Sequence, residues 1–335
     1  MAQRNYYIDL AKGIGILFVV LSHNKNPLNP YIYSFHMPLF FLLSGIFHPT
    51  NQELKTFVKK RVQRLLVPYF CFSTVLFLFW FLLARRFGGS ASQDTSVFES
   101  FMGIFMGTQI NGISNIVWGG TLWFLPCLFL VGCMYHLISR YSIKYIILFN
   151  IAAVLLNLAL TRIFKTLFPW SFLTALMALP FYTFGNLFKT HLQQKPNNNH
   201  FWTDNAVLFI LSISTFFLGS PFGINMASNR YYNGLLFFIG GFAGSLLIIN
   251  LVKLIPKDRF KWINYLGMNT LVIFAFHLRA QTVIKYLWPI FFHQEFVEGS
   301  ILFAILYAFL EILLCIPLIY IINRYLPFCI GKSVK

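Results

Sequence analysis

Residues 65–84 read LLVPYFCFSTVLFLFWFLLA, twenty consecutive positions without a charged side chain. A helix of about 20 residues rises about 30 Å, which matches the hydrocarbon core of a bilayer. The stretch therefore predicts a membrane-spanning helix. The composition agrees, because 58% of the 335 residues are hydrophobic and only 10% are charged, whereas a soluble domain carries about 25% charged residues.

Further apolar runs of this kind recur along the whole chain, and together they predict an all-α polytopic membrane protein with about ten transmembrane helices. We expect one membrane-embedded domain over residues 1–335, multi-pass in the cell (inner, cytoplasmic) membrane. The ten predicted spans are Ile8–Ser22, Phe35–Phe47, Leu65–Ala84, Trp118–Ile138, Ile143–Leu160, Leu167–Phe188, Ala206–Leu218, Tyr232–Leu254, Met268–Ile290 and Ser300–Ile322.

The basic residues predict the orientation of these spans. With the N-terminus inside, 17 Lys and Arg fall in cytoplasmic segments, six fall in outer segments and three lie within helices. This bias follows the positive-inside rule and predicts that both termini are cytoplasmic. It also explains the net charge of +17 without nucleic acid as a partner, although an anionic ligand could add a second cause.

The longest predicted outer loop covers residues 85–117. Its apolar stretch Phe98–Met106 is compatible with an interfacial or re-entrant helix.

The five cysteines lie in or beside apolar runs, and none has metal-ligand spacing. We interpret them as buried thiols and expect neither a disulfide nor a metal site. They are Cys71, Cys127, Cys133, Cys315 and Cys329.

The first span carries Asp9 and Lys12, and a third ionisable residue, His23, follows directly at its end. Ionisable groups inside a span are costly, so each is a candidate functional residue. Lys12 and His23 are eleven residues apart, which places them on one helix face about 16 Å apart along the axis. Asp9 precedes Lys12 by three residues and can pair with it. The structural alternative is an ion pair at the interface and a histidine that caps the helix end.

Two more histidines lie in apolar runs. His36 enters the second span from the side that His23 reaches, and an imidazole is well suited to general-base work. Its alternative role is a hydrogen bond that closes the helical hairpin. His277 lies mid-run and must face protein or a water-filled cavity, as a functional group or as a polar tie between helices.

A basic cluster precedes the third span, with Lys60, Arg61 and Arg64 at its centre. Arg61 and Arg64 are spaced i, i+3 and would project from one helix face. Arginine binds phosphate through two parallel hydrogen bonds, so the cluster suits the pyrophosphate and 3′-phosphate of coenzyme A. The alternative is a purely topological role beside anionic lipid.

Five segments in this order resemble the acyltransferase-3 family of membrane acyltransferases, and within it the fucose 4-O-acetylase-like group. The resemblance extends from Tyr7 to about Arg324. The matching elements are Asp9, Lys12, Gly13 and His23; the Pro-Leu-Phe-Phe-Leu-x-Ser-Gly run ending at Ser44 and Gly45; Arg61 and Arg64 with Pro68 and Tyr69; the Leu-Trp-Phe-Leu run at Trp123; and the Leu-Gly-x-Asn-Thr segment that leads to His277.

The resemblance implies an O-acetyltransferase that uses acetyl-CoA and needs no metal. Its acceptor would be a hydroxyl of a cell-surface glycan such as O-antigen, capsule or exopolysaccharide, either free or lipid-linked. His23 would act in catalysis, with Asp9 and His36 as further catalytic candidates. Arg61 and Arg64 would bind the donor together with Lys12 and Lys60. Many members carry arginine where this chain has Lys12, which keeps the charge but loses the bidentate fork.

The expected acceptor side comprises Trp123, His277 and Asn24. For Trp123 the alternative is a membrane-interface belt. A glycan or lipid-linked sugar exporter would also explain ten spans with buried polar groups, although we find no internal repeat of the kind transporters show. A non-catalytic receptor or scaffold leaves the ordered motifs unexplained.

Overall fold

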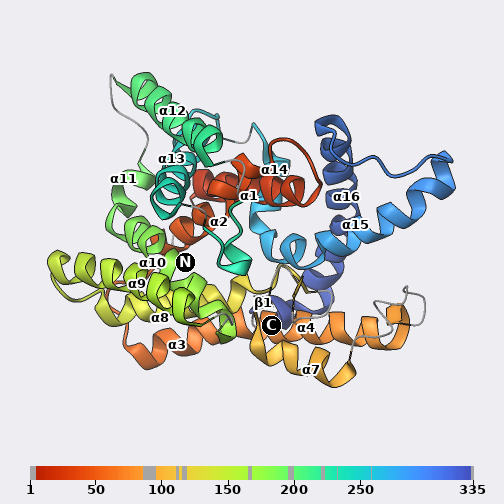
Figure 1. Cartoon of the computed structure of the whole chain (residues 1–335), viewed down its shortest axis with the longest axis horizontal. Helices are drawn as coiled ribbons and strands as arrows, with labels where there is room; N and C mark the ends of the chain where they lie inside the picture. Colours follow the sequence, from red (N-terminus) through yellow and green to blue (C-terminus); the bar gives the residue numbers. More distant parts are fainter. Residues whose placement is uncertain are drawn as a thin grey trace. The chain divides into compact units, whose positions relative to one another are not determined.

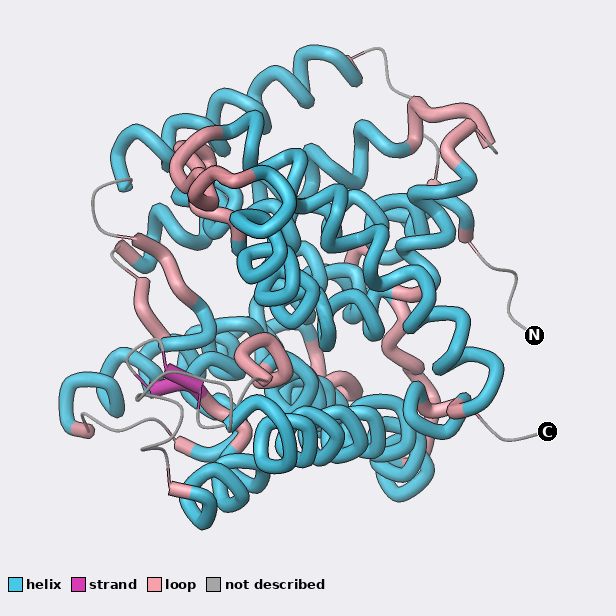
Figure 2. Tube along the Cα trace, turned by 90° about the vertical axis from the view of Figure 1, so that its right-hand side faces the viewer, coloured by secondary structure: helices cyan, strands magenta, loops and turns pink. Residues whose placement is uncertain are grey.

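The computed structural model describes residues 5–85, 96–110, 113–114, 119–164, 168–194, 200–219, 223–231, 233–257 and 259–332. Helices dominate this part of the chain (Figure 2). The strands β1 (Gln109–Ile110) and β2 (Ile113–Ser114) form one short antiparallel pair. The prediction of an all-α fold is confirmed.

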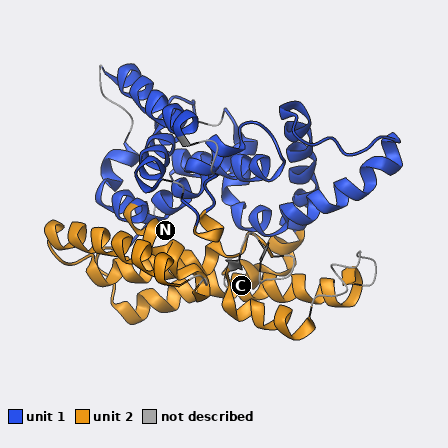
Figure 3. Cartoon of the chain, in the orientation of Figure 1, with its two compact units in different colours: residues 1–48, 181–225, 230–320 blue, residues 49–180, 226–229, 321–335 orange. Residues whose placement is uncertain are grey.

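The chain divides into two compact units, coloured in Figure 3 and labelled by element in Figure 1. Unit 1 comprises residues 1–48, 181–225 and 230–320, and unit 2 comprises residues 49–180, 226–229 and 321–335. The helices of unit 1 are α1 (Tyr6–His23), α2 (Asn29–Ile46), α11 (Lys189–Gln193), α12 (Phe201–Gly219), α13 (Gly234–Val252), α14 (Lys261–Met268) and α15 (Thr270–Phe292).

Unit 2 holds the remaining short and long helices as well as the strand pair. Its helices are α3 (Leu54–Arg61), η1 (Val62–Leu66), α4 (Val67–Phe79), η2 (Trp80–Ala84), α7 (Val97–Met106), α8 (Phe124–Ile138), α9 (Ile143–Ile163), η3 (Pro169–Ser171), η5 (Met226–Ser228) and η6 (Pro327–Ile330). Two helices begin in one unit and end in the other, α10 (Phe172–Leu187) and α16 (Ile301–Tyr325).

Within the described residues, each of the ten predicted apolar runs overlaps at least one helix. By length and composition, six helical stretches of the described residues could cross a membrane: Tyr6–His23, Leu54–Ala84, Ile143–Ile163, Phe201–Leu218, Gly234–Val252 and Ile301–Tyr325. α2 and α15, which carry His36 and His277, are not among the six. The chain is thus a multi-pass membrane protein, while the count of ten spans and the side of the termini stay predictions.

Part of the sequence-based prediction lies outside the described residues. This applies to the starts of three predicted spans, Trp118, Leu167 and Tyr232, and to residues 86–95, 111–112 and 115–117 of the long loop. It also applies to five residues of the charge count, Arg4, Arg86, Lys165, Lys195 and Lys335. Within that loop α7 covers the stretch for which the sequence suggests a helix. Ser96 caps α7 by accepting a hydrogen bond from the backbone N–H of Glu99.

Helix α1 is regular from its cap to His23. The side chain of Asn5 accepts a hydrogen bond from the N–H of Tyr7 at 3.0 Å, which satisfies one of the free donors at the helix start. Gly13 lets α1 approach α14 so closely that a Cβ there would overlap the backbone of Ile263. The motif glycine is therefore needed for helix contact.

A second close crossing joins α2 and α10 within unit 1. A Cβ at Gly45 would overlap the carbonyl of Tyr182, and a Cβ at Gly185 would overlap the carbonyl of Leu42. Small residues at such crossings let two backbones touch, which is how membrane helices gain dispersion energy without a hydrophobic driving force. The Ser-Gly end of the second motif thus has a packing role.

A π-helical turn, η1, interrupts the α-helix just after Arg61. Pro68 has no N–H to donate to the carbonyl of Arg64, and its ring crowds that carbonyl. The N–H of Val67 bonds instead to the carbonyl of Val62, five residues back. Arg61 and Arg64 therefore do not follow the regular i, i+3 geometry that the sequence suggests, and π-turns are frequent at functional sites.

The prediction that all cysteines are free thiols is wrong for one pair. Cys71 on α4 and Cys329 on η6 form a disulfide within unit 2. They are 258 residues apart, so their spacing carries no sign that η6 packs on α4. Cys127, Cys133 and Cys315 are free.

The α2–α10 crossing predicts a steric effect on stability. Gly45→Ala should destabilise the protein by about 1–3 kcal/mol, because the new methyl group would overlap backbone that cannot move aside. For a chain of this size we expect the melting temperature in detergent to fall by about 2–8 °C.

Gly234→Ala is the matched control. Gly234 begins α13, and a Cβ there would meet no atom within 4 Å. This variant should melt at or slightly above the wild-type temperature, since alanine favours a helix over glycine. Equal melting temperatures for Gly45→Ala and the wild type would contradict the crossing.

Candidate active site

His23 is the last residue of α1 and is partly exposed. Its Nδ1 lies 2.8 Å from the carbonyl oxygen of Val19. A carbonyl oxygen can only accept, so Nδ1 carries the hydrogen and donates it. The neutral imidazole then has its lone pair at Nε2, where it can accept a proton.

His277 on α15 lies directly against His23. It is fully buried, and its Nδ1 donates to the carbonyl of Ile273 at 2.9 Å. Its Nε2 is therefore an acceptor, and it lies 3.3 Å from Nδ1 of His23, with ring centroids 4.9 Å apart. The N–H of His23 thus lies between two acceptors, Val19 and His277. An imidazole whose far nitrogen is held in this way is oriented like the base of a catalytic triad.

His36 on α2 has the same local geometry. Its Nδ1 donates to the carbonyl of Ile32 at 2.7 Å, and the side chain is buried. The ring of Tyr33 lies 5.1 Å from the ring of His36 and 6.4 Å from that of His23. Tyr33 therefore contacts both imidazoles, although no sequence pattern singles it out.

Beside His23 lies a buried polar network that joins three helices. Asn24 donates from Nδ2 to Oε1 of Glu311 at 2.8 Å and to the carbonyl of Val20 at 3.1 Å. Gln281 donates from Nε2 to the carbonyl of His23 at 2.9 Å and to Oδ1 of Asn24 at 3.0 Å. Both hydrogens of the Asn24 amide are therefore used in holding the end of α1.

Glu311 is the functional candidate that sequence reasoning missed. It is fully buried, and its Oε2 has no hydrogen-bond partner among the described residues. A buried polar atom without a partner calls for a ligand, a water or an ion. The available signal was that Glu311 is the only charged residue in the run Ser300–Ile322. Gln281 carried no such signal.

Asp9 and Lys12 lie toward the other end of α1. Lys12 Nζ is 3.6 Å from Oδ1 of Asp9 and 4.7 Å from the ring centre of Phe47. Asp9 precedes His23 by fourteen residues, about 21 Å along the helix. Asp9 therefore does not reach the imidazole of His23. Its contact with Lys12 indicates that Asp9 supports the amine of that lysine.

The expected donor residues lie in unit 2. The rings of Phe57 and His136 stack with centroids 4.2 Å apart and planes at 5°. The guanidinium carbon of Arg61 lies 5.2 Å from the ring centre of Phe57, and a Cβ at Gly132 would lie 3.6 Å from Arg61 Nε. The guanidinium is therefore held between an aromatic face and a glycine on α8. Cation–π contact of this kind favours arginine over lysine.

The rest of the basic cluster is more open. Lys60 and Arg64 are exposed. A Cβ at Gly331, after η6, would lie 2.9 Å from Cα of Arg64, so the C-terminal segment packs against the π-turn. Trp123 at the start of α8 is only 5% exposed and contacts Phe124 edge to face. Its burial argues against the interfacial belt that the sequence left open.

The structure thus places the predicted residues in three groups. His23, His277 and Asn24 form one network in unit 1, with His36 joined through Tyr33. Asp9 and Lys12 form a pair elsewhere on α1. The third group, in unit 2, consists of Lys60, Arg61, Arg64 and Trp123.

A family model described as an acyltransferase domain matches residues 5–320 of the chain. No curated protein matches the chain. No solved structure matches it either. The matched range contains the histidine network, the arginine pair and all five motif segments. The chain therefore belongs to the acyltransferase-3 family of membrane acyltransferases.

Proposed function

We propose that this acyltransferase moves an acetyl group from acetyl-CoA to a sugar hydroxyl of a cell-surface glycan, either free or lipid-linked. The observation that supports the proposal most directly is the orientation of His23. Its Nδ1 hydrogen is held by Val19 and His277, which leaves the Nε2 lone pair as the base. A sugar hydroxyl is a weak nucleophile at neutral pH and needs such a base within hydrogen-bond reach.

In the proposed reaction, Nε2 of His23 accepts the proton of the acceptor hydroxyl as the oxygen attacks the thioester carbonyl. The new C–O ester bond forms and the C–S bond breaks. The CoA thiolate leaves with the proton that His23 returns, so CoA-SH and the acetyl ester are the products. In a two-step variant the acetyl group would first reside on Nε2 of His23. Rapid quenching with labelled acetyl-CoA distinguishes the two routes.

On the donor side, Arg61 and Arg64 would bind the phosphates of CoA, with Lys60 and Lys12 adding positive charge. The contact of Arg61 with Phe57 and Gly132 supports this role, because a guanidinium fixed before binding loses less entropy on binding.

On the acceptor side, Trp123 and His277 would serve the sugar, whereas Asn24 has a structural role. Both amide hydrogens of Asn24 are used within the protein, so we assign it to positioning the end of α1. His277 would act on the acceptor through His23, as a positioning residue. The Oε2 of Glu311, which has no hydrogen-bond partner in the part of the chain that the structure describes, is an additional candidate for a hydroxyl contact. Trp123 would line one side of the sugar-binding site.

His23→Ala should abolish acetyl transfer. Loss of a general base lowers the rate by about 10²–10⁴-fold. The measurement is CoA release together with mass-spectrometric detection of the acetylated glycan, at matched amounts of membrane-inserted protein. His191→Ala removes an exposed imidazole on α11 and should keep full activity. Full activity of His23→Ala would remove His23 from the mechanism. Glycan movement without CoA release would favour an exporter.

His277→Ala should lower kcat and leave the KM for acetyl-CoA unchanged, because His277 acts on the orientation of His23. We expect His277→Gln to retain more activity than His277→Ala, since its Oε1 can still accept a hydrogen bond from His23. The measurement is steady-state kinetics of all three proteins. Equal kcat for the wild type and His277→Ala would rule out a positioning role.

Arg61→Gln and Arg64→Gln should each raise the KM for acetyl-CoA about 10-fold with little change in kcat, as expected for loss of a charge-assisted hydrogen bond. They should not affect acetyl-pantetheine, which lacks the phosphates. Arg324→Gln is the matched control, because it removes an exposed arginine of unit 2 that lies outside the cluster. Unchanged use of acetyl-CoA by both variants would leave the arginines with a topological role.

A further inference from the structure

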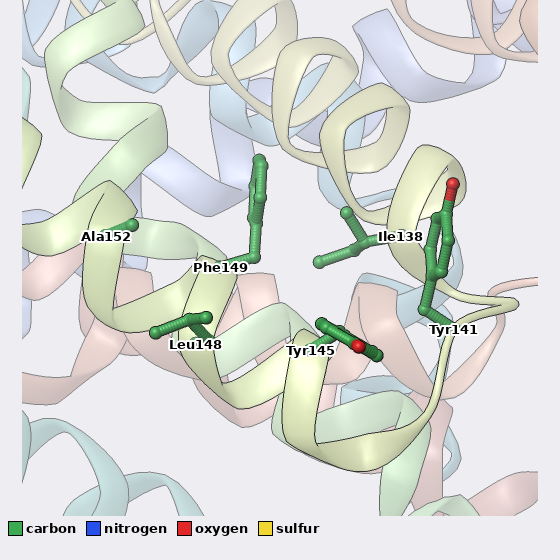
Figure 4. Close-up of a pocket in the computed structure, with 6 residues that line it drawn as sticks. All are labelled: Ile138, Tyr141, Tyr145, Leu148, Phe149 and Ala152. Carbon is green, nitrogen blue, oxygen red and sulfur yellow. The ribbon is translucent and has the colours of Figure 1, made fainter.

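A pocket of about 550 Å³ opens on unit 2 where α8 turns into α9 (Figure 4). It begins at Ile138 at the end of α8 and continues along α9. Four of its residues on α9 are spaced i, i+3, i+4 and i+7, so they form one stripe of the helix. The six lining residues are Ile138, Tyr141, Tyr145, Leu148, Phe149 and Ala152.

The lining restricts the chemistry of a ligand. Apart from the hydroxyls of Tyr141 and Tyr145, these side chains offer no hydrogen-bonding group. A free sugar or nucleotide would leave its polar groups unpaired in such a site. α9 is one of the six potential spans, and most of it is exposed on the surface of the protein. An acyl chain is therefore the ligand group that fits the stripe.

The start of α9 adds positive charge beside the two tyrosines. Arg140 and Lys144 flank Tyr141 in sequence and are exposed. A guanidinium nitrogen of Arg140 donates to the carbonyl of Gln52 at 2.9 Å, which restrains its side chain. The first turn of α9 has no acidic residue, and the side chain of Ser142 does not cap it. A helix start of this kind attracts anions.

We propose that this pocket binds one anionic phospholipid. Its phosphate would lie at the start of α9, beside Arg140, Lys144 and the tyrosine hydroxyls, and one acyl chain would follow the stripe to Ala152. Because the acyl chain is surrounded by apolar groups in the bilayer as well, selectivity comes from the headgroup. The pocket does not depend on acetyl transfer.

The test uses full-length protein in nanodiscs that contain equal amounts of phosphatidylglycerol and phosphatidylcholine. Lipids retained after transfer to detergent are counted by native mass spectrometry. The wild type should retain phosphatidylglycerol in preference, with one copy saturating. R140Q/K144Q should weaken that preference by about five-fold for each removed charge.

Two further variants separate a site from a general charge effect. K257Q/K261Q removes the same charge from an exposed segment of unit 1 and should leave the preference intact. Ala152→Trp fills the end of the stripe and should lower retention of that one lipid with all charges present. Equal losses for the two charge variants, or wild-type retention by Ala152→Trp, would overturn the proposal.

Discussion

The hydrogen on Nδ1 of His23 is the point on which the candidate site depends. It lies between an oxygen of its own helix, 2.8 Å from Nδ1, and a nitrogen of α15, 3.3 Å from Nδ1. These two contacts fix the tautomer, the ring orientation and the direction of the Nε2 lone pair together. A carboxylate commonly holds the imidazole of a hydrolytic triad. Here a backbone carbonyl and a second imidazole take that place.

In a membrane, the polar groups beside His23 also satisfy the backbone carbonyls at the end of α1. The last four carbonyls of a helix have no partner within it, and in an apolar environment each unpaired group is costly. In α1 the carbonyl of Val20 accepts from the Asn24 amide, that of Leu21 accepts from the Asn24 N–H, and that of His23 accepts from Gln281. Asn24 and Gln281 therefore close the helix end, while the carbonyl of Val19 and His277 orient the imidazole ring beside it.

Much of the fold follows from local sequence signals. Apolar runs of nearly span length indicate where the long helices lie, because the bilayer requires length and hydrophobicity that no soluble domain needs. The predicted spacing of Lys12 and His23 holds, since α1 is a regular helix. The sequence does not predict the π-helical turn at Arg64, because the effect of Pro68 on the preceding turn depends on how the chain packs. The Cys71–Cys329 disulfide escapes prediction for a related reason, since it joins segments 258 residues apart.

The candidate site can likewise be predicted only in part from the sequence, because it depends on how distant segments pack. His23, His36 and His277 stand out as imidazoles within apolar runs, so the sequence alone makes each a candidate. Glu311 stands out equally, as a carboxylate within an apolar run. Only its hydrogen bond with Asn24 assigns it to the network beside His23. Gln281 is an ordinary polar residue until α15 brings it to the end of α1. A sequence can indicate which residues are costly in a membrane, whereas their partners depend on helix packing.

The choice of base among the three imidazoles follows from access. All three donate Nδ1–H to the carbonyl four residues earlier, so all three have their lone pair at Nε2. In His277 that lone pair faces His23, and the ring is fully buried. His36 is 3% exposed and packs against Tyr33. Of the three, only His23 has both a partly exposed ring and an Nε2 that contacts no other imidazole of the described residues. A base that meets an incoming hydroxyl requires this access.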